Sequence, residues 1–143
     1  MKVKVARIDG FKDKASYLDK TDPKVKMWLG NAANPKSGEK MKTTTKDNAG
    51  GSVTFDEVLV FNKAENMNLL TVAVYDDNSL GDESFGELSI DLNLQDLTGS
   101  VETKEPICFQ VAKDGKSTGK VFLSLVAAEK AGAEKASADP KVM

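Results

Sequence analysis

Short runs in which apolar and polar residues alternate occur along most of the chain. Val25, Met27 and Leu29, for example, are separated by Lys26 and Trp28. Successive side chains of a strand point to opposite faces, so a period of two predicts strands that are buried on one face. The ranges in which we expect strands are 2–8, 24–29, 41–45, 53–61, 69–76, 87–92, 107–111 and 120–126.

The segments between these runs carry turn residues rather than a helical pattern. Asp114-Gly115 is a hairpin signal inside the loop predicted for 113–119. The connection 93–106 is expected to hold a helical turn around Leu94 and Leu97. No amphipathic helix of about 10–15 residues alternates with the strands, which argues against βαβ units. The pattern predicts an all-β protein, an eight-stranded antiparallel β-sandwich.

Length and composition are typical of one globular domain. Of the 143 residues, 40% are hydrophobic and 29% are charged, as in soluble domains. No run of about 18 apolar residues predicts a membrane-spanning helix, and the alternating N-terminal MKVKVARIDG is unlike a signal peptide. We expect a domain over residues 1–128 and a flexible C-terminal tail over 129–143, which is small, charged and without aromatic residues.

Charge and residue content narrow the classes of function. The formal net charge of −2 does not fit a generic nucleic-acid binder, which is usually basic. The chain has no histidine, which removes the commonest general base and the common nucleophile pairs. Its one cysteine, Cys108, cannot form an intrachain disulfide. The sequence therefore predicts a cytoplasmic protein that is not an enzyme and does not bind nucleic acid.

The loop that follows residues 69–76 is rich in oxygen donors. Its donors are Asp76, Asp77, Asn78, Ser79, Asp82 and Glu83. Hard divalent cations, Ca²⁺ above all, take about six to eight oxygen ligands, so this loop indicates a calcium-type site at one end of a β-domain. Asp and Asn also favour turns, because they hydrogen-bond their own backbone, and this second interpretation stays open.

Four segments of the chain resemble parts of the C2 domain. KVKVARIDGF resembles the opening strand, and TDPKVKMWLG resembles the SDPYVKV-type signature with Asp22-Pro23 in register. VTFDEVLVF resembles the PVWNETFTF-type strand, and LLTVAVYDDNSLGDESFGELSIDL resembles the LxVxVxDxDxxxxDDFIGExxIxL signature. The resemblance covers roughly residues 2–127. It implies a C2-like Greek-key sandwich in the type II, phospholipase-C-like arrangement.

The resemblance also implies Ca²⁺-dependent binding of phospholipid headgroups through three loops at one end. The positions that correspond to the family's calcium ligands, with their acidic neighbours, are Ser16, Asp19, Asp22, Asp76, Asn78, Asp82 and Glu83. Ser16 and Asn78 stand where the family usually has Asp, and Lys24 replaces the usual Tyr after Asp-Pro. Because Ca²⁺ affinity depends on the charge of the ligands, we expect a weak or single-ion site.

Two groups of residues are candidates for membrane contact. The apolar candidates, at the predicted tips of the first and third loops, are Tyr17, Leu18 and Leu80. They either insert into a bilayer or fold back onto the domain. The basic candidates are Lys24, Lys26 and Lys42, with Lys36, Lys40 and Lys46 beside them. They form either a patch for anionic lipids or an ordinary solvated sheet face.

Two functions remain after these exclusions. The first is a calcium-dependent module that binds anionic phospholipid membranes as a peripheral, reversibly attached cytoplasmic protein. The second is a calcium-independent protein-interaction or scaffold domain whose ion site has degenerated. We expect a monomer in both cases, with a membrane as the partner in the first and a protein in the second.

Overall fold

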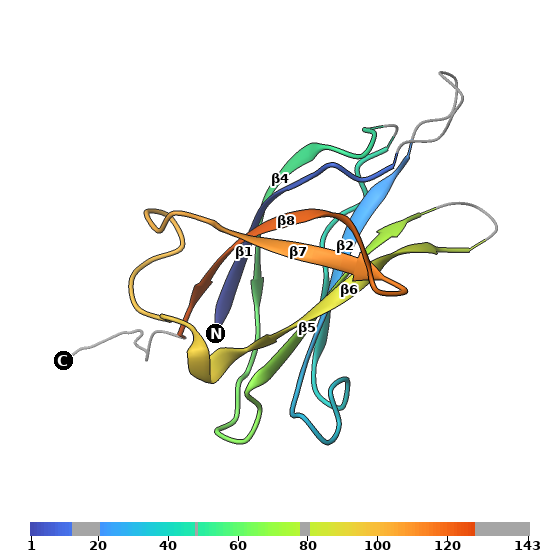
Figure 1. Ribbon diagram of the computed structural model, residues 1–143. Coiled ribbons are helices and arrows are strands. Elements are labelled where there is room, and N and C mark those ends of the chain that lie inside the picture. Colours follow the sequence, from blue (N-terminus) through green and yellow to red (C-terminus); the bar gives the residue numbers. More distant parts are fainter. Residues whose placement is uncertain (13–20, 48, 78–80, 128–143) are drawn as a thin grey trace.

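Eight strands and one short 3-10 helix form the fold in the computed structural model, which describes residues 1–12, 21–47, 49–77 and 81–127 (Figure 1). The strands are β1 (Lys2–Asp9), β2 (Pro23–Gly30), β3 (Lys40–Lys42), β4 (Val53–Val60), β5 (Leu69–Asp76), β6 (Glu83–Asp91), β7 (Ile107–Lys113) and β8 (Lys116–Val126), and the helix is η1 (Leu92–Leu94). Each of their pairings is antiparallel. The all-β antiparallel fold predicted from the alternating pattern is confirmed.

The strands form one nearly closed sheet in the order β3-β2-β5-β6-β7-β8-β1-β4. The sheet folds over the core as two layers, β3-β2-β5-β6 and β7-β8-β1-β4 (Figure 1). Between β6 and β7 the register holds one pair, Glu87 with Ala112. Thr44, two residues after β3, is joined to β4, because the Glu57 carboxylate accepts bonds from the Thr44 backbone N–H at 2.9 Å and from its hydroxyl at 2.6 Å.

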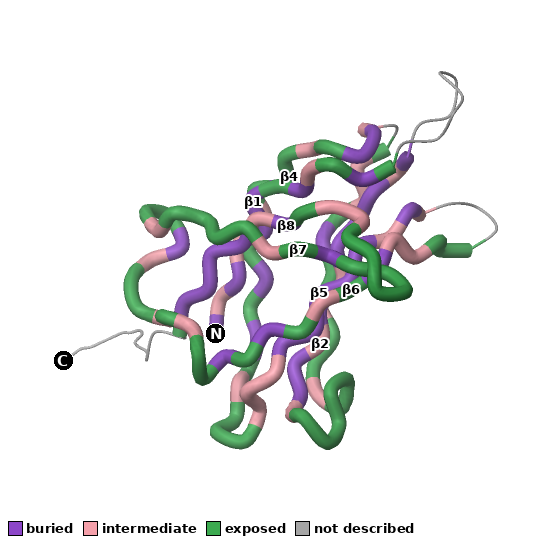
Figure 2. The backbone as a smooth tube through the Cα atoms, viewed as in Figure 1, coloured by how far each residue is buried: buried purple, intermediate pink, exposed green. Residues whose placement is uncertain are grey.

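The core lies between the two layers and is built from the apolar half of the alternating pattern (Figure 2). On β2, Val25, Met27 and Leu29 are fully buried, whereas Lys26 and Trp28 between them keep part of their surface in solvent. The other layer contributes Val3, Val5, Val121, Leu123 and Leu125. Full burial of one such side chain stabilises the fold by about 1.5–3 kcal/mol, so the pattern also fixes which face of each strand turns outward.

The third strand is shorter than the range 41–45 that the sequence predicts, and ends at Lys42. Thr43 is buried, and its hydroxyl accepts the Val25 N–H at 3.0 Å. Its own N–H donates to the Val25 carbonyl at 2.9 Å. The threonine side chain therefore replaces a backbone acceptor of the ladder, which ends regular pairing at this point.

The hairpin between β7 and β8 is tighter than the loop expected over 113–119. Its turn consists of Asp114 and Gly115, which have φ values of 54° and 79°. Two successive residues with positive φ form the turn that an Asp-Gly pair favours in a two-residue hairpin. The helical turn expected around Leu94 and Leu97 is present as η1, which covers Leu92–Leu94.

The described ends of four connections lie together at what we call the loop end of the sandwich (Figure 1). The connections are β1–β2, β3–β4, β5–β6 and β7–β8. The register brings them together, because Asp9 at the end of β1 pairs with Lys120 of β8, and Asp76 at the end of β5 pairs with Pro23 at the start of β2. Of the predicted ion ligands, Asp22, Asp76, Asp82 and Glu83 lie in the described part of this end.

Gly86 allows β6 and β7 to approach each other, and we expect its replacement to weaken that seam. Its φ is 122°, and a Cβ atom there would lie 2.3 Å from the Ala112 carbonyl oxygen. Gly81 has the same φ but no atom within 4 Å of such a Cβ, so it is a matched control for backbone strain alone. We expect Gly86→Ala to lower the free energy of unfolding by about 1–3 kcal/mol more than Gly81→Ala in urea titrations. Equal losses would show that the close approach at Gly86 does not matter.

Candidate functional site

A buried carboxylate joins the first and third loops at their bases. Asp76, the last residue of β5, is 1% exposed, and its Oδ1 accepts the backbone N–H of Asp22 at 3.0 Å. The Asp77 N–H donates to the Asp22 carbonyl at 2.9 Å. Two hydrogen bonds therefore fix the end of β5 against the start of β2. Asp76 serves this junction whether or not it also contacts an ion.

The predicted calcium ligands fall into two groups in the structure. Asp22, Asp76, Asp82 and Glu83 are described, and they belong to the adjoining ends of β2, β5 and β6, where Glu83 pairs with Asp76. Ser16, Asp19 and Asn78 lie outside the described residues, as do the loop-tip candidates Tyr17, Leu18 and Leu80. Among the described residues, the fold thus places Asp22 near Asp76, Asp82 and Glu83, and the predicted ligand set as a whole stays a prediction.

The side chain of Lys24 lies among the third-loop carboxylates. Its Nζ is 2.9 Å from Oδ2 of Asp82 and 3.6 Å from Oδ2 of Asp77. Lys26 Nζ approaches the same Asp82 oxygen at 2.7 Å. The Lys24 side chain is 9% exposed, so this is a largely buried ammonium group rather than a solvated surface charge. Sequence reasoning treated Lys24 only as a candidate for lipid contact and did not foresee this pairing.

These contacts change the proton affinities of the groups involved. Hydrogen bonds from the Lys26 and Lys24 ammonium groups lower the pKa of Asp82 from 3.8 to about 2. Burial acts to lower the pKa of Lys24, but the hydrogen bond and the charge of Asp82, together with Asp77, outweigh it and raise that pKa above its ordinary value. Both partners of the pair are therefore charged at neutral pH.

The described carboxylates, as arranged, do not fit a calcium ion. In the ranges that the structure covers, no three His, Cys, Asp or Glu side chains form a group that would hold a metal. The Lys24 ammonium lies beside Asp77 and Asp82, where a cation would bind, and the Thr45 hydroxyl donates at 2.7 Å to the same Oδ2 atom of Asp77 that Lys24 approaches. A Ca²⁺ site needs about six to eight oxygens, which this arrangement does not present.

A face of aromatic and basic side chains extends from the loop end along β2 and β3. We call it the lysine face, and it consists of Lys26, Trp28, Lys36, Lys40 and Lys42, with Tyr75 of β5 beside them. Lys26 pairs in register with Lys42 and Trp28 with Lys40, so these side chains stand on one side of the sheet. The ammonium groups of Lys36 and Lys40 lie 4.4 and 5.8 Å from the Trp28 ring centroid.

The lysines differ in whether a carboxylate neutralises them. Lys26 binds Asp82, and Lys36 binds Glu87 at 3.0 Å. Among the described residues, no ion pair is formed by Lys40 or Lys42, and both are exposed. Lys46, which the sequence grouped with them, lies instead 3.8 Å from Glu57. The uncompensated positive charge of the face is therefore that of β3.

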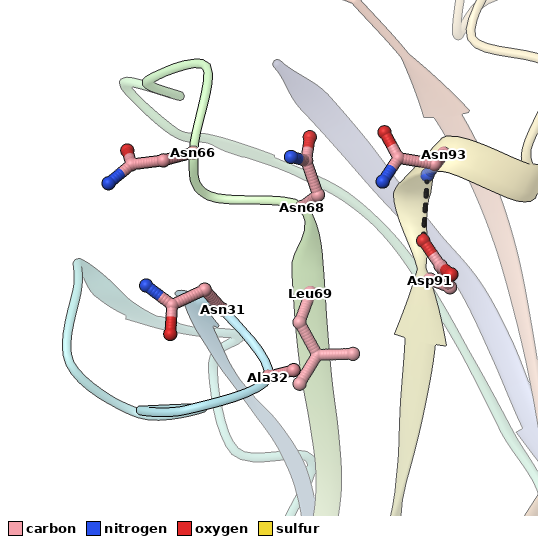
Figure 3. Close-up of a pocket in the computed structure, with 7 residues that line it drawn as sticks. All are labelled: Asn31, Ala32, Asn66, Asn68, Leu69, Asp91 and Asn93. Atoms are coloured by element: carbon pink, nitrogen blue, oxygen red, sulfur yellow. Dashed lines mark hydrogen bonds between the residues drawn. The ribbon is translucent and has the colours of Figure 1, made fainter.

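A pocket of about 260 Å³ lies at the opposite end of the sandwich and was not foreseen from the sequence (Figure 3). It is lined by residues of the β2–β3 and β4–β5 connections, of the adjoining ends of β5 and β6 and of η1, namely Asn31, Ala32, Asn66, Asn68, Leu69, Asp91 and Asn93. Asp91 accepts the Asn93 N–H at 3.0 Å, and Asn68 donates to the Glu65 carbonyl at 2.7 Å. These bonds stabilise turns, which accounts for Asp91 and Asn68 without a ligand.

Comparison with known proteins identifies the class of this fold as a β-sandwich of the C2 type. The family model for the C2 domain matches residues 1–108, and the chain belongs to the C2 domain family. C2 domains are non-catalytic modules, and the family is one of membrane and phospholipid binding. No curated protein sequence is significantly similar to the chain. The domain boundary at 128 and the tail over 129–143 stay predictions.

Solved structures show the same fold at low sequence identity. A single C2 domain of plant extended synaptotagmin 1 is 23% identical with a TM-score of 0.66, and the match covers 85% of this chain and 88% of that one. A C2 domain-containing protein from a putative elicitor-responsive gene is 21% identical with a TM-score of 0.62, covering 90% and 89%. The calcium-bound tandem C2 domains of extended synaptotagmin 2 are 19% identical with a TM-score of 0.57, covering 85% and 42%. Within the described ranges, no helix has the length and apolar character that crossing a bilayer requires.

The paired lysines make the contribution of Asp82 to stability dependent on pH. Its pKa in the folded protein is about 2, below the ordinary 3.8, so the contribution is present above about pH 4 and is lost as the pH falls toward 2. We expect Asp82→Asn to be less stable than the wild type by about 1 kcal/mol at neutral pH and equally stable near pH 2, in chemical denaturation at each pH.

Asp47→Asn is the control, because Asp47 is exposed and forms no ion pair within the described part of the chain. Its effect on the free energy of unfolding should not change over the same range. A loss for Asp82→Asn that persists unchanged at pH 2 would contradict the charge pairing.

Proposed function

We propose that this C2 domain binds anionic phospholipid surfaces through its lysine face and does so without requiring Ca²⁺. The observation that carries the proposal is the pair of exposed lysines on β3, Lys40 and Lys42, which form no ion pair with a described residue and lie beside the half-buried ring of Trp28. Lysine ammonium groups near an anionic membrane contribute about 1 kcal/mol each. Tryptophan suits the boundary between water and lipid, because its ring is apolar and its N–H is polar.

The independence from Ca²⁺ follows from Lys24. In the C2 mechanism implied by the resemblance, a divalent ion neutralises the loop carboxylates, which would otherwise repel phosphate. Here Lys24 and Lys26 already neutralise Asp82, and Lys24 lies near Asp77. The loop end can therefore approach a negative surface with its own cations in place of the ion.

Calcium-dependent binding through the loops is the second candidate function. The convergence of Asp22, Asp76 and Glu83 at the loop end favours it, because three carboxylates near one another attract cations. The first candidate is preferred because the described residues provide a lysine rather than further oxygens at this place. An acidic protein surface would also suit the lysine face, and it becomes the interpretation if vesicles are not bound.

Co-sedimentation with vesicles of phosphatidylcholine and phosphatidylserine tests the proposal. We expect wild-type protein to sediment equally in EGTA and in Ca²⁺, and not to sediment with phosphatidylcholine alone. Lys40→Gln combined with Lys42→Gln should weaken binding by about 2 kcal/mol, which is roughly 30-fold. Lys2→Gln combined with Lys63→Gln removes the same charge at the opposite end and should have little effect. Sedimentation only in Ca²⁺ would favour the second candidate, and none in either condition would contradict both.

Removal of the Lys24 ammonium should make the loop end sensitive to Ca²⁺. Lys24→Met leaves Asp77 without its only lysine neighbour among the described residues and Asp82 with Lys26 alone, so a cation should bind there more strongly. We expect millimolar Ca²⁺ to raise the melting temperature of Lys24→Met but not that of the wild type. Lys42→Met, which removes the same charge away from these carboxylates, is the matched control. A Ca²⁺-induced shift that is as large in the wild type as in Lys24→Met would contradict the role assigned to Lys24.

A further inference from the structure

We propose that another pocket, which lies at the loop end of the sandwich, binds a phosphomonoester group. The pocket has a volume of about 420 Å³ and lies where the end of β1, the start of β6 and the β7–β8 hairpin meet. Its cationic walls are Lys12 and Lys113, and its hydroxyl groups belong to Ser84, Ser117 and Thr118. It shares no residue with the lysine face, so the proposal goes beyond the function argued above.

The ammonium group of Lys113 is held in place at the pocket. Its Nζ donates to the Ser84 carbonyl at 3.0 Å, which fixes the long side chain across the start of β6. An ammonium group has three donors, so two remain for a ligand. Within the described residues neither Lys113 nor Lys12 forms an ion pair. The pocket therefore has two ammonium groups that form no ion pair with a described carboxylate, and that of Lys113 is already held in place.

Two of the three hydroxyl groups that line the pocket donate hydrogen bonds to described residues, and the third does not. Thr118 donates to the Phe85 carbonyl, and Ser117 donates to the Gln110 side chain at 2.8 Å. Ser84 instead accepts the Gly86 N–H at 3.0 Å, and its own hydroxyl hydrogen has no acceptor among the described residues. Ser84 is thus oriented as an acceptor toward its own backbone, with its donor left for an anion. Ammonium and hydroxyl donors together match the oxygens of a phosphate group.

The remaining walls favour a phosphate carried on an organic group over a bare anion. The Phe85 ring packs on Phe11 with centroids 5.6 Å apart and presents an apolar surface to the pocket. Glu83 is exposed at the same pocket and lowers its affinity for a free anion, but it is an acceptor for a hydroxyl group on the alcohol part of an ester. A phosphomonoester such as glycerol 3-phosphate has both parts, and so does the headgroup of phosphatidic acid.

The hairpin offers a control for charge alone. Residues 113–120 contain three lysines and one aspartate, so any anion is attracted to this region in general. Lys116 is exposed, pairs with Lys113 across the turn and does not line the pocket. Replacing Lys116 removes the same charge from the same hairpin, but not from the site.

Titration with glycerol 3-phosphate, followed by amide chemical shifts in ¹H–¹⁵N spectra, tests the pocket directly. We expect saturable shifts at Gly10, Ser84 and Thr118. Lys12→Gln and Lys113→Gln should each weaken binding about tenfold, whereas Lys116→Gln should change it less than twofold. Lys12 is included because its side chain forms no ion pair with a described residue, so its replacement should leave the fold intact. Equal weakening by all three variants, or no saturable shift, would overturn the proposal.

Vesicles then distinguish a lipid from a soluble ligand. Phosphatidic acid presents a phosphomonoester and phosphatidylglycerol does not, so a lipid-binding pocket should give stronger sedimentation with the first at equal content. That preference should be lost in Lys12→Gln and kept in the variant lacking Lys40 and Lys42, whose overall binding is weaker. Glycerol 3-phosphate binding without this preference would assign the pocket to a soluble ester. Because the titration needs no membrane, it tests the proposal for the pocket independently of the proposal for the lysine face.

Discussion

The buried carboxylate of Asp76 fixes the geometry on which the rest of the loop end depends. A carboxylate excluded from water is costly unless it is hydrogen-bonded, and here it accepts the Asp22 N–H at 3.0 Å. This bond holds the start of β2 against the end of β5. Lys24 follows Asp22 by two residues, so the junction also determines that its side chain reaches Asp77 and Asp82. One satisfied buried group thus sets the charge arrangement of two loops.

The pairing of Lys24 with Asp82 lowers the affinity of the loop end for other cations. Exposed ion pairs contribute about 0–1 kcal/mol, but the side chains here are 9% and 23% exposed, so solvent screens them less. At about 4 Å and an effective dielectric constant of 20, two unit charges attract by about 4 kcal/mol before the cost of desolvation. Because Lys24 belongs to the same chain as Asp82, their pairing costs no entropy of association, unlike the binding of a free ion. A calcium ion must displace it or bind beside it, and both cost affinity.

Alternation allowed the strands and the outward face of β2 to be predicted, because burial of Val25, Met27 and Leu29 leaves Lys26 and Trp28 no other side. The grouping of Asp22, Asp76, Asp82 and Glu83 followed from the family's signature. The pairing of Lys24 with Asp82 did not, because it joins residues 58 positions apart and depends on the register of β2 with β5 and β6. The pocket proposed for a phosphomonoester could not be predicted from the sequence for the same reason, since its walls come from three segments that no local pattern connects.

The pairing of lysines with carboxylates along β2 and β3 changes with distance from the loops, and this change relates the loop end to the lysine face. Lys24 and Lys26 are bound to third-loop carboxylates, Lys36 is bound to Glu87, and Lys40 and Lys42 are paired with no described carboxylate. Two of the described third-loop carboxylates, Asp77 and Asp82, are therefore paired with lysines, while the lysines without such a partner lie on β3. A domain that used an ion to reverse the charge of its loops would not need this arrangement. A domain that meets an anionic surface with its own lysines does need it, because acidic loops left uncompensated would oppose the approach of β3.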